Sequence, residues 1–260
     1  MPPSPPKSTS STVVKILKMK DNAEQERVEK ESGFDLPFRV LLIGKSQLSG
    51  KTNYVGNLML RPYSDDDVDG KEFYMRDFLG RNIYVVCPSL KLDRKWPEII
   101  SGKQIPDGNI MHKYDEAELQ AIYERIAARY LEDRLANRPA EHSLVILDDC
   151  AFSGALKEKL NGVLSEIACN GRHILLSMLV TAQKYSQVHT TIRENASGLI
   201  LWGCSNKQLD LIIDDHCEIP KKDFVTIFRD ATRKKYSNMV INYSNDYDKR
   251  LLDQHFLPLL

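Results

Sequence analysis

One stretch of sequence decides the fold, Arg39-Val-Leu-Leu-Ile-Gly-Lys-Ser-Gln-Leu-Ser-Gly-Lys-Thr52, in which an apolar segment runs directly into a glycine-containing turn. Its last three residues have the composition of a phosphate-binding loop, where backbone amides surround phosphates, a lysine reaches the terminal phosphates and a hydroxyl holds Mg2+. We therefore expect Lys51 to be a catalytic phosphate-binding residue and Thr52 a Mg2+ ligand. The flanking apolar strand and helix favour this interpretation over a chance Gly-Lys-Thr triplet in a surface turn.

The loop is one residue longer than the usual phosphate-loop signature. Gly44 lies one position too early for that spacing, and Lys45 stands where the first glycine is expected. We still expect the whole of this longer loop to surround the phosphates. The expected nucleotide-binding residues are Gly44, Lys45, Ser46, Gln47, Leu48, Ser49, Gly50, Lys51, Thr52 and Asn53.

A second motif, Ser143-Leu-Val-Ile-Leu-Asp-Asp149, is typical of a buried parallel strand with two carboxylates at its carboxyl end. Next to a phosphate loop it predicts a Walker B motif. Asp148 would then hold Mg2+, usually through water, and Asp149 would polarise the attacking water as general base. Alone, such a segment is as typical of a strand that ends in a helix-capping aspartate. The two motifs together favour a nucleotide site.

Apolar strands and amphipathic helices alternate along the chain, which predicts an α/β fold with a parallel sheet. Strands are expected at Arg39–Ile43, Asn82–Val86, within Ser143–Asp149, and at Ile174–Val180, Gly198–Trp202 and Asn238–Tyr243. Helices are expected from Lys51, over Glu116–Leu135, around Leu156–Ile167 with Leu160 on its apolar face, and over Lys207–Asp214 and Asp223–Phe228. This order indicates a P-loop NTPase of the additional-strand type, with a mostly parallel central sheet flanked by helices on both faces.

Three polar residues outside the two motifs are further catalytic candidates. Gln183 follows the strand expected to end at Val180, and ligands of such sheets bind outside the carboxyl ends of the strands, so it is placed to sense the terminal phosphate. Arg193, in a mostly neutral loop, and Arg172, before that strand, are candidates to neutralise charge on the transferred phosphoryl group. Each arginine could act in its own subunit or a neighbour's. The alternative for all three is a solvent-facing side chain.

Composition favours a soluble protein with a substantial core. Of the 260 residues 42% are hydrophobic, and no apolar run reaches transmembrane length. We find no secretory signal, and the five cysteines lack paired metal-type spacing, so reduced, buried thiols in a reducing compartment are expected.

The balance of charge excludes a protein that coats nucleic acid with an overall positive field, because 36 basic residues match 36 acidic ones. Any contact with nucleic acid must therefore be local. The candidate clusters are Lys91, Arg94 and Lys95, and Arg229, Arg233, Lys234 and Lys235, although each cluster alone is as typical of a solvated face.

Two parts of the chain differ in composition. Residues 1–31 begin with a segment rich in proline and serine and continue with a highly charged one, which predicts a flexible or partly helical extension. Residues 32–260 are expected to form the P-loop ATPase domain.

These motifs, in this order, resemble the viral genome-packaging ATPases of the poxvirus type. That family is a branch of the FtsK-HerA group of P-loop NTPases, found in large DNA viruses, virophages and related elements. The resemblance spans roughly Phe34 to Tyr247. It rests on Gly50-Lys51-Thr52, Pro88-Ser89, Leu147-Asp-Asp-Cys150, Gly171-Arg-His173, Gln183-Lys-Tyr185 and Ile192-Arg-Glu-Asn195.

The resemblance implies an ATP-driven, Mg2+-dependent motor that assembles as a homo-oligomeric ring of five or six subunits and pumps double-stranded DNA into a preformed capsid. It also implies a partner at the capsid vertex or portal, and a location in the virion or at a virus assembly site in the host cytoplasm. Arg193 or Arg172 would act across the subunit interface. The lengthened loop departs from the family pattern, which leaves the roles of Lys45 and Gln47 open.

Three other functions compete with a motor. A GTP-binding switch is suggested by Asn206-Lys-Gln-Leu-Asp210, although its aspartate is one residue too late for the guanine-reading signature. A small-molecule kinase shares the phosphate loop but normally lacks a strand between the loop strand and Walker B, and Asn82–Val86 is a candidate for that strand. A nucleotide-gated assembly scaffold would bind ATP with almost no turnover.

Overall fold

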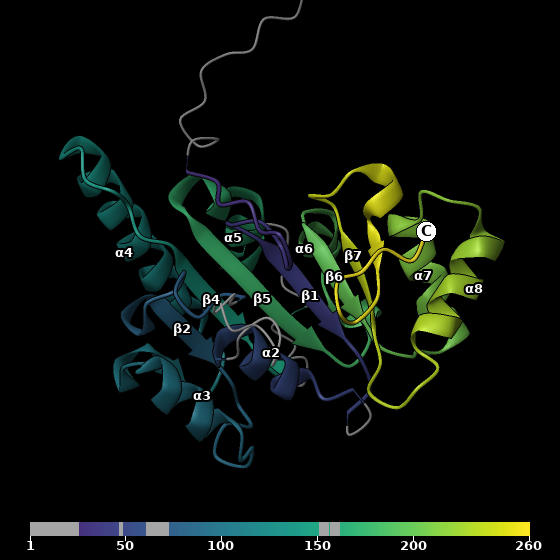
Figure 1. The fold of residues 1–260 in the computed structure, drawn as a ribbon. Helices are drawn as coiled ribbons and strands as arrows, with labels where there is room; N and C mark the ends of the chain where they lie inside the picture. The colour runs from purple at the N-terminus through teal and green to yellow at the C-terminus, as the bar shows by residue number, and fades with distance from the viewer. Residues whose placement is uncertain (1–25, 47–48, 61–72, 151–155, 157–161) are drawn as a thin grey trace, which may run out of the picture.

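The computed structural model describes residues 26–46, 49–60, 73–150, 156 and 162–260. Most of the expected N-terminal extension, the loop residues Gln47 and Leu48, and Leu160 lie outside the described residues. The described residues form three layers, with helices on both faces of one sheet (Figure 1). The α/β architecture expected from the sequence is confirmed.

The central sheet has eight strands in the order β3-β2-β4-β5-β1-β6-β7-β8. Their bounds are β1 Arg39–Ile43, β2 Ile83–Val86, β3 Ile110–Met111, β4 Ser143–Leu147, β5 Leu176–Ala182, β6 Gly198–Leu201, β7 Met239–Asn242 and β8 Leu251–Leu252. Strands β1 to β6 are parallel to one another, whereas β7 pairs antiparallel with β6 and β8 antiparallel with β7. The sheet is therefore mostly parallel, with an antiparallel edge.

The strand between the phosphate-loop strand and the Walker B strand is β5. It pairs with β1 on one side and with β4 on the other, which defines the additional-strand arrangement. The proposal that Asn82–Val86 is the inserted strand is wrong, because β2 pairs with β4 on its outer side. Sequence order along the chain does not reveal which parallel strand enters the centre of the sheet.

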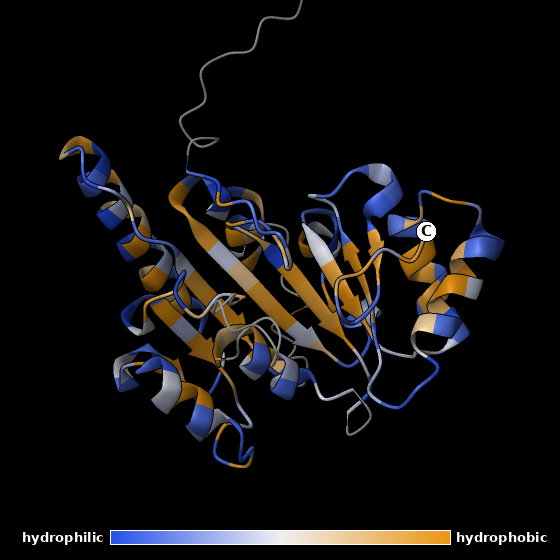
Figure 2. Ribbon diagram, in the orientation of Figure 1, coloured by the Kyte–Doolittle hydropathy of each residue, from blue (hydrophilic) through white to orange (hydrophobic). Residues whose placement is uncertain are grey.

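Successive side chains of a strand point to opposite faces of the sheet, so the hydrophobic core forms two clusters, one on each face. In β1, Val40 and Leu42 pack with helices α2 (Lys51–Leu60) and α3 (Trp96–Lys103), and Leu41 and Ile43 pack with the helices of the opposite face. Apart from Arg39 at the start of β1, the residues of the central strands β1, β4 and β5 are buried, and these strands are largely hydrophobic, whereas the helices carry many hydrophilic residues (Figure 2). Continuous apolar runs of this kind are expected where helices cover both faces of a parallel sheet.

The described helices are α2 Lys51–Leu60, α3 Trp96–Lys103, α4 Glu116–Leu135, α5 Val163–Asn170, α6 Thr190–Glu194, α7 Asn206–His216 and α8 Lys221–Ala231. The bounds predicted for α4 are confirmed, and the Asp115 carboxylate caps it by accepting from the Glu118 amide at 3.1 Å. Three short elements were not predicted, namely α3, β3 and β8. The segment around Arg193, expected to be a loop, is helix α6, because one turn is too short to show a helical period.

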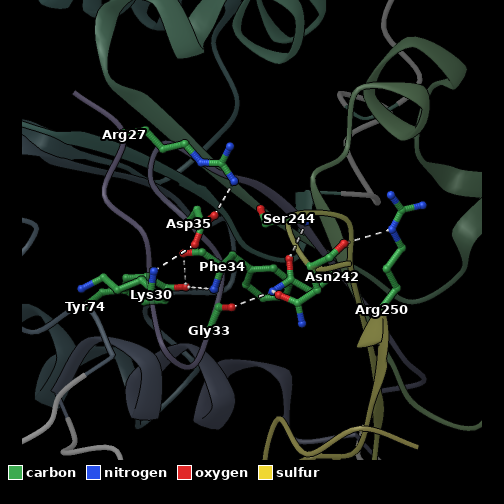
Figure 3. Close-up of polar contacts among 10 residues, drawn as sticks. Arg27, Lys30, Gly33, Phe34, Asp35, Tyr74, Asn242, Ser244 and Arg250 are labelled. Carbon is green, nitrogen blue, oxygen red and sulfur yellow. Dashed lines mark hydrogen bonds and ion pairs between the residues drawn. The ribbon is translucent and has the colours of Figure 1, made fainter. Parts of the chain in front are cut away.

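The segment before β1 is fixed to the domain by backbone contacts (Figure 3). The Tyr74 hydroxyl accepts from the Phe34 amide at 2.6 Å and donates to the Phe34 carbonyl at 3.0 Å. On the other side of the segment, the Asn242 side-chain amide donates to the Gly33 carbonyl at 2.8 Å. These bonds hold the Phe34 ring, 1% exposed, in the core beside β6 and β7.

Residues just before the expected boundary at Ser32 also contact the domain. The Lys30 ammonium pairs with Asp77 at 2.5 Å, and Glu26 pairs with Arg134 of α4 at 2.7 Å. The boundary itself stays a prediction. Among the described residues, no helix combines the length and apolar character needed to cross a membrane.

The contact between β6 and Phe34 gives a test of the fold. A Cβ atom on Gly198 would lie 2.1 Å from Phe34 Cε1 and 2.9 Å from the Ile241 carbonyl oxygen, so Gly198→Ala should destabilise the protein by about 2 kcal/mol or more through overpacking. Thermal denaturation of the full chain measures the effect. Gly203→Ala is the matched control, because no atom of the described residues lies within 4 Å of its added Cβ. Equal melting temperatures for the two variants would contradict this packing.

Candidate active site

The phosphate loop connects β1 to α2 at the carboxyl edge of the sheet. Lys51, the first residue of α2, directs its ammonium back across the loop and donates to the Gly44 carbonyl at 2.7 Å. Ser49 donates its hydroxyl to the Lys45 carbonyl at 2.8 Å. The side chain of Lys51, which is expected to bind phosphates, therefore bonds to the other end of the loop.

The additional residue of the loop does not remove the need for its two glycines. A Cβ on Gly44 would lie 2.6 Å from Ser49 Cβ and 3.0 Å from Trp202 Cβ. Gly50 has a φ of 70°, in the left-handed region that favours glycine. Gly44 thus serves as the first glycine of the loop although it stands one position early.

Burial lowers the pKa of the Lys51 ammonium, and the carboxylates of Asp148 and Asp149 oppose that shift. Two opposing effects therefore act on the pKa of Lys51, namely burial and the attraction of the two acids. An anion bound at the loop would add to the effect of the acids and favour the charged ammonium.

Asp148 is 2% exposed and lies at the centre of a hydrogen-bond network. Its Oδ2 accepts from Trp96 Nε1 at 2.8 Å and from the Thr52 hydroxyl at 3.3 Å, and its Oδ1 accepts from the Thr181 hydroxyl at 2.6 Å. The Cys87 thiol lies 3.8 Å from Oδ2, and burial raises its pKa to about 12, so it remains protonated. A buried carboxylate requires such donors to offset its lost hydration.

Thr181 joins the two acids. Besides donating to Asp148, its hydroxyl oxygen accepts from the Asp149 amide at 3.1 Å. Asp149 has a φ of 55°, a left-handed conformation at the strand end that this bond helps to hold. Sequence reasoning missed both Thr181 and Trp96. The signal for Thr181 in the sequence is a hydroxyl at the end of an apolar strand, two residues before Gln183.

A cavity of about 1470 Å3 opens beside the loop. Its phosphate-loop end is lined by Ser46, Ser49, Gly50, Lys51, Thr52 and Asn53, and across from them by Asp148, Asp149 and Thr181. The structure therefore brings most of the expected loop residues and both acids to one cavity. Its other end reaches Trp202, Tyr236, Asn238 and the turn at residues 254–257.

The three remaining catalytic candidates do not line this cavity. Gln183 is exposed just after β5. Arg172 is exposed before β5, near the amino end of β1, where it and burial lower the pKa of the Arg39 guanidinium. Arg193 is 9% exposed and pairs with Asp215 at 3.1 Å. Their catalytic roles stay predictions, and neither arginine reaches the phosphate loop of its own subunit.

The residues expected to hold Mg2+ fit that ion. Thr52 and Asp148 bring a hydroxyl and a carboxylate within 3.3 Å of each other, and Mg2+ is typically bound through one or two such oxygens together with phosphates and water. The described residues contain no cluster of three or more His, Cys, Asp or Glu suited to a metal. A site completed by substrate phosphates needs no such cluster.

The two basic clusters lie beside this cavity rather than far from it. Lys91, Arg94 and Lys95 are exposed before α3, and Lys95 lines the cavity. The second cluster is exposed at the end of α8 and in the turn that leads to Tyr236, another lining residue. Both clusters therefore remain candidates for contact with a polyanion.

Comparison with known proteins identifies the family. The family model described as Poxvirus A32 protein matches residues 96–251, more than half of the chain. The chain belongs to the poxvirus A32 protein family. The matched span contains Asp148, Asp149 and Thr181 but begins after the phosphate loop, so the loop is assigned by its own geometry. Comparison of this family member with curated protein sequences gives no match.

Solved structures of an NTPase and of an ATPase share the fold of this A32 family member. The genome packaging NTPase B204 from Sulfolobus turreted icosahedral virus 2, in complex with ATP-gammaS, aligns with a TM-score of 0.51 at 14% identity, covering 79% of this chain and 92% of that chain. EssC (ATPases 2 and 3) from Geobacillus thermodenitrificans aligns with a TM-score of 0.56 at 13% identity, covering 86% of this chain and 40% of that chain. At these identities the likeness shows the fold.

The bridge formed by Thr181 gives a test of the site. Thr181→Val keeps the shape of the side chain but removes the donor to Asp148 and the acceptor for the Asp149 amide. Turnover of ATP should fall by about tenfold to a hundredfold, whereas KM should change less, because the acids and not the phosphate loop are disturbed. Thr226→Val is the control, because Thr226 is exposed on α8 and its hydroxyl donates to the Lys222 carbonyl at 3.0 Å. A Thr181→Val variant with the kinetics of the control would refute the bridge.

Proposed function

We propose that this protein is an ATP-hydrolysing DNA translocase that packages a double-stranded viral genome into a preformed capsid. One observation carries the proposal: Lys51, Thr52, Asp148 and Asp149 converge on one cavity at the carboxyl edge of an additional-strand sheet, in a member of the A32 family. The convergence supports hydrolysis of a nucleotide, and the family supports packaging as its use.

The position of each residue supports a separate role in hydrolysis. Lys51 binds the terminal phosphates in place of the Gly44 carbonyl that it contacts here. Thr52 and Asp148 would hold Mg2+, which neutralises phosphate charge when it is bound. Asp149 lies beside the buried Asp148 but is itself partly exposed to the cavity, so it is the acid free to accept a proton from an attacking water.

The guanine-reading alternative is not favoured by the positions of its residues. Asn206, Lys207 and Asp210 lie in the first half of α7, and none of them lines the cavity. The guanine base of a nucleotide bound at the phosphate loop would therefore not contact these three residues. Insertion of β5 beside β1 also separates this fold from the kinase arrangement, in which no strand lies between the loop strand and Walker B.

Work on DNA requires partners beyond a single chain. B204, which shares the fold, is described as a DNA-packaging ATPase in Sulfolobus turreted icosahedral virus. By extension we propose a homo-oligomeric ring of five or six subunits around double-stranded DNA, docked on capsid vertex or portal-like proteins. It would act in the virion or at an assembly site in the host cytoplasm.

Of the two arginine candidates, Arg172 is better placed to act on a neighbouring subunit. Its side chain is exposed at the edge of the sheet opposite the phosphate loop. Arg193 would have to break its pair with Asp215 and leave the Tyr185 ring, which lies 4.7 Å from its guanidinium carbon. A ring that sets the amino edge of one sheet against the carboxyl edge of the next would bring Arg172 to a phosphate.

Two substitutions test the assignment of roles. Lys51→Ala should abolish ATP binding or turnover. Asp149→Asn should keep binding but trap ATP, with hydrolysis reduced about a hundredfold or more through loss of the general base. The measurements are the rate of phosphate release and the amount of ATP retained by the full chain. Lys207→Ala, an exposed lysine outside the cavity, is the control and should match wild type. Equal turnover in Asp149→Asn and wild type would remove Asp149 from its role.

Stimulation by DNA tests the proposed substrate. Long double-stranded DNA should raise the rate of ATP hydrolysis, and the effect should weaken steeply as salt rises, because contacts to DNA phosphates release counterions. The rate is measured with and without DNA over a series of salt concentrations. Hydrolysis that is unaffected by DNA would argue against a translocase. Phosphate found on a metabolite rather than released to water would indicate a kinase, and near-zero turnover with or without DNA a scaffold.

A further inference from the structure

The cavity extends well past the phosphate loop, and the order of the strands gives it a direction. The two acids and Thr181 follow β4 and β5, which lie on one side of β1. Strands β6, β7 and β8 lie on the other side. A nucleotide whose terminal phosphate faces the acids therefore directs its sugar and base toward β6 to β8.

An aromatic ring borders the loop at that end. Tyr236 is 52% exposed and lines the cavity, and its Cδ1 lies 3.9 Å from the position that a Cβ on Gly50 would take. Its φ of 69° is unusual for tyrosine, and its carbonyl accepts from Trp202 Nε1 at 3.0 Å. The backbone is thus held in a strained conformation that sets the ring beside the phosphate loop, with the Lys235 ammonium over the ring at 4.8 Å from its centroid.

Two buried polar atoms among the lining residues have no hydrogen-bond partner within the described part of the chain. They are the Tyr54 hydroxyl oxygen and Asn238 Oδ1, and Asn238 is only 3% exposed. Burial raises the pKa of Tyr54, so its hydroxyl keeps a proton to donate. Buried polar groups in native proteins are almost always paired, and two orphans on one cavity indicate a missing polar partner.

The opposite wall is a fixed turn. The Asp253 carboxylate accepts from the amides of His255 and Leu257 at 2.8 and 3.0 Å. Phe256, between them, packs edge-on against Phe34 with ring centroids 5.8 Å apart, which anchors the turn in the core. This part of the cavity lining is therefore held in place by the protein's own contacts, which lowers the cost of ordering it when a ligand binds.

We propose that Tyr54, Tyr236 and Asn238, with the turn at residues 254–257, form an adenine subsite. This inference rests on the proposed function, because it requires a nucleotide triphosphate at the loop. Tyr236 supplies a stacking face. The Asn238 acceptor matches the amino group of adenine, where guanine carries a carbonyl oxygen, and the Tyr54 hydroxyl can donate to a ring nitrogen.

Binding of three compounds to the full-length protein tests the subsite, with affinities measured by calorimetry. Inorganic tripolyphosphate fills only the phosphate end, whereas ATP and GTP add two different bases. Wild type should bind ATP about tenfold more tightly than either of the other two. Asn238→Leu should weaken ATP by about tenfold and abolish the preference over GTP, and tripolyphosphate should bind as before.

Tyr236→Ala is the second variant, and its exposed side chain can be removed without disturbing the core. It should weaken ATP and GTP alike by about tenfold through loss of stacking. Tyr247→Ala is the matched control, because Tyr247 is 54% exposed and lies outside the cavity. If Asn238→Leu fails to fold, Tyr236→Ala and the wild-type comparison still decide the question.

The outcomes separate this inference from the proposed function. Equal affinity of wild type for ATP and tripolyphosphate would overturn the adenine subsite and leave the phosphate site intact. Equal weakening of ATP and tripolyphosphate by either variant would also overturn it, since the phosphate end would then be the part disturbed. Failure of wild type to bind any of the three compounds would overturn the proposed function, and the subsite with it.

Discussion

The buried carboxylate of Asp148 is the group on which the assembly of the site depends. A charge that is 2% exposed must be offset by donors, and they come from α2 through Thr52, from α3 through Trp96 and from β5 through Thr181. Loss of one donor would leave an uncompensated charge, so these elements are held in one arrangement around the acid. The phosphate loop and the Walker B strand therefore meet at a fixed geometry, although more than ninety residues separate Thr52 from Asp148 in the sequence.

The inserted strand β5 determines on which side of the phosphate loop the two acids lie. Because β5 lies between β1 and β4, its Thr181 hydroxyl reaches Asp148 and the Asp149 amide, and the acids are confined to one side of the phosphate loop. The antiparallel edge β6 to β8 then borders the other side. One sheet thus provides a hydrolytic end and a separate end that can recognise the rest of a nucleotide, without a second domain.

Short sequence patterns predicted those parts of the site that depend on residues next to one another in the chain. An apolar strand followed by glycine, lysine and threonine places Lys51 and Thr52 at a sheet edge, and an apolar run before Asp148 does the same for the acid, so their meeting followed from parallel strands. The choice of Gln183 over Thr181 shows the limit. Thr181 lies in β5 and Gln183 directly follows it, and only the three-dimensional structure reveals which of the two side chains meets Asp148. Trp96 was missed for a related reason, since an indole far from both motifs gives no sequence signal of the carboxylate that it contacts.

Two tryptophans fix the two ends of the site, and one of them also packs against the first glycine of the phosphate loop. Trp96 donates to Asp148 at the hydrolytic end. Trp202 donates to the Tyr236 carbonyl at the other end, and its Cβ lies 3.0 Å from the position of a Cβ on Gly44. The first glycine is thus packed against the residue that also holds the aromatic wall. Within the same loop, the Ser49 hydroxyl donates to the Lys45 carbonyl at 2.8 Å, so the residues next to the two glycines are joined to each other.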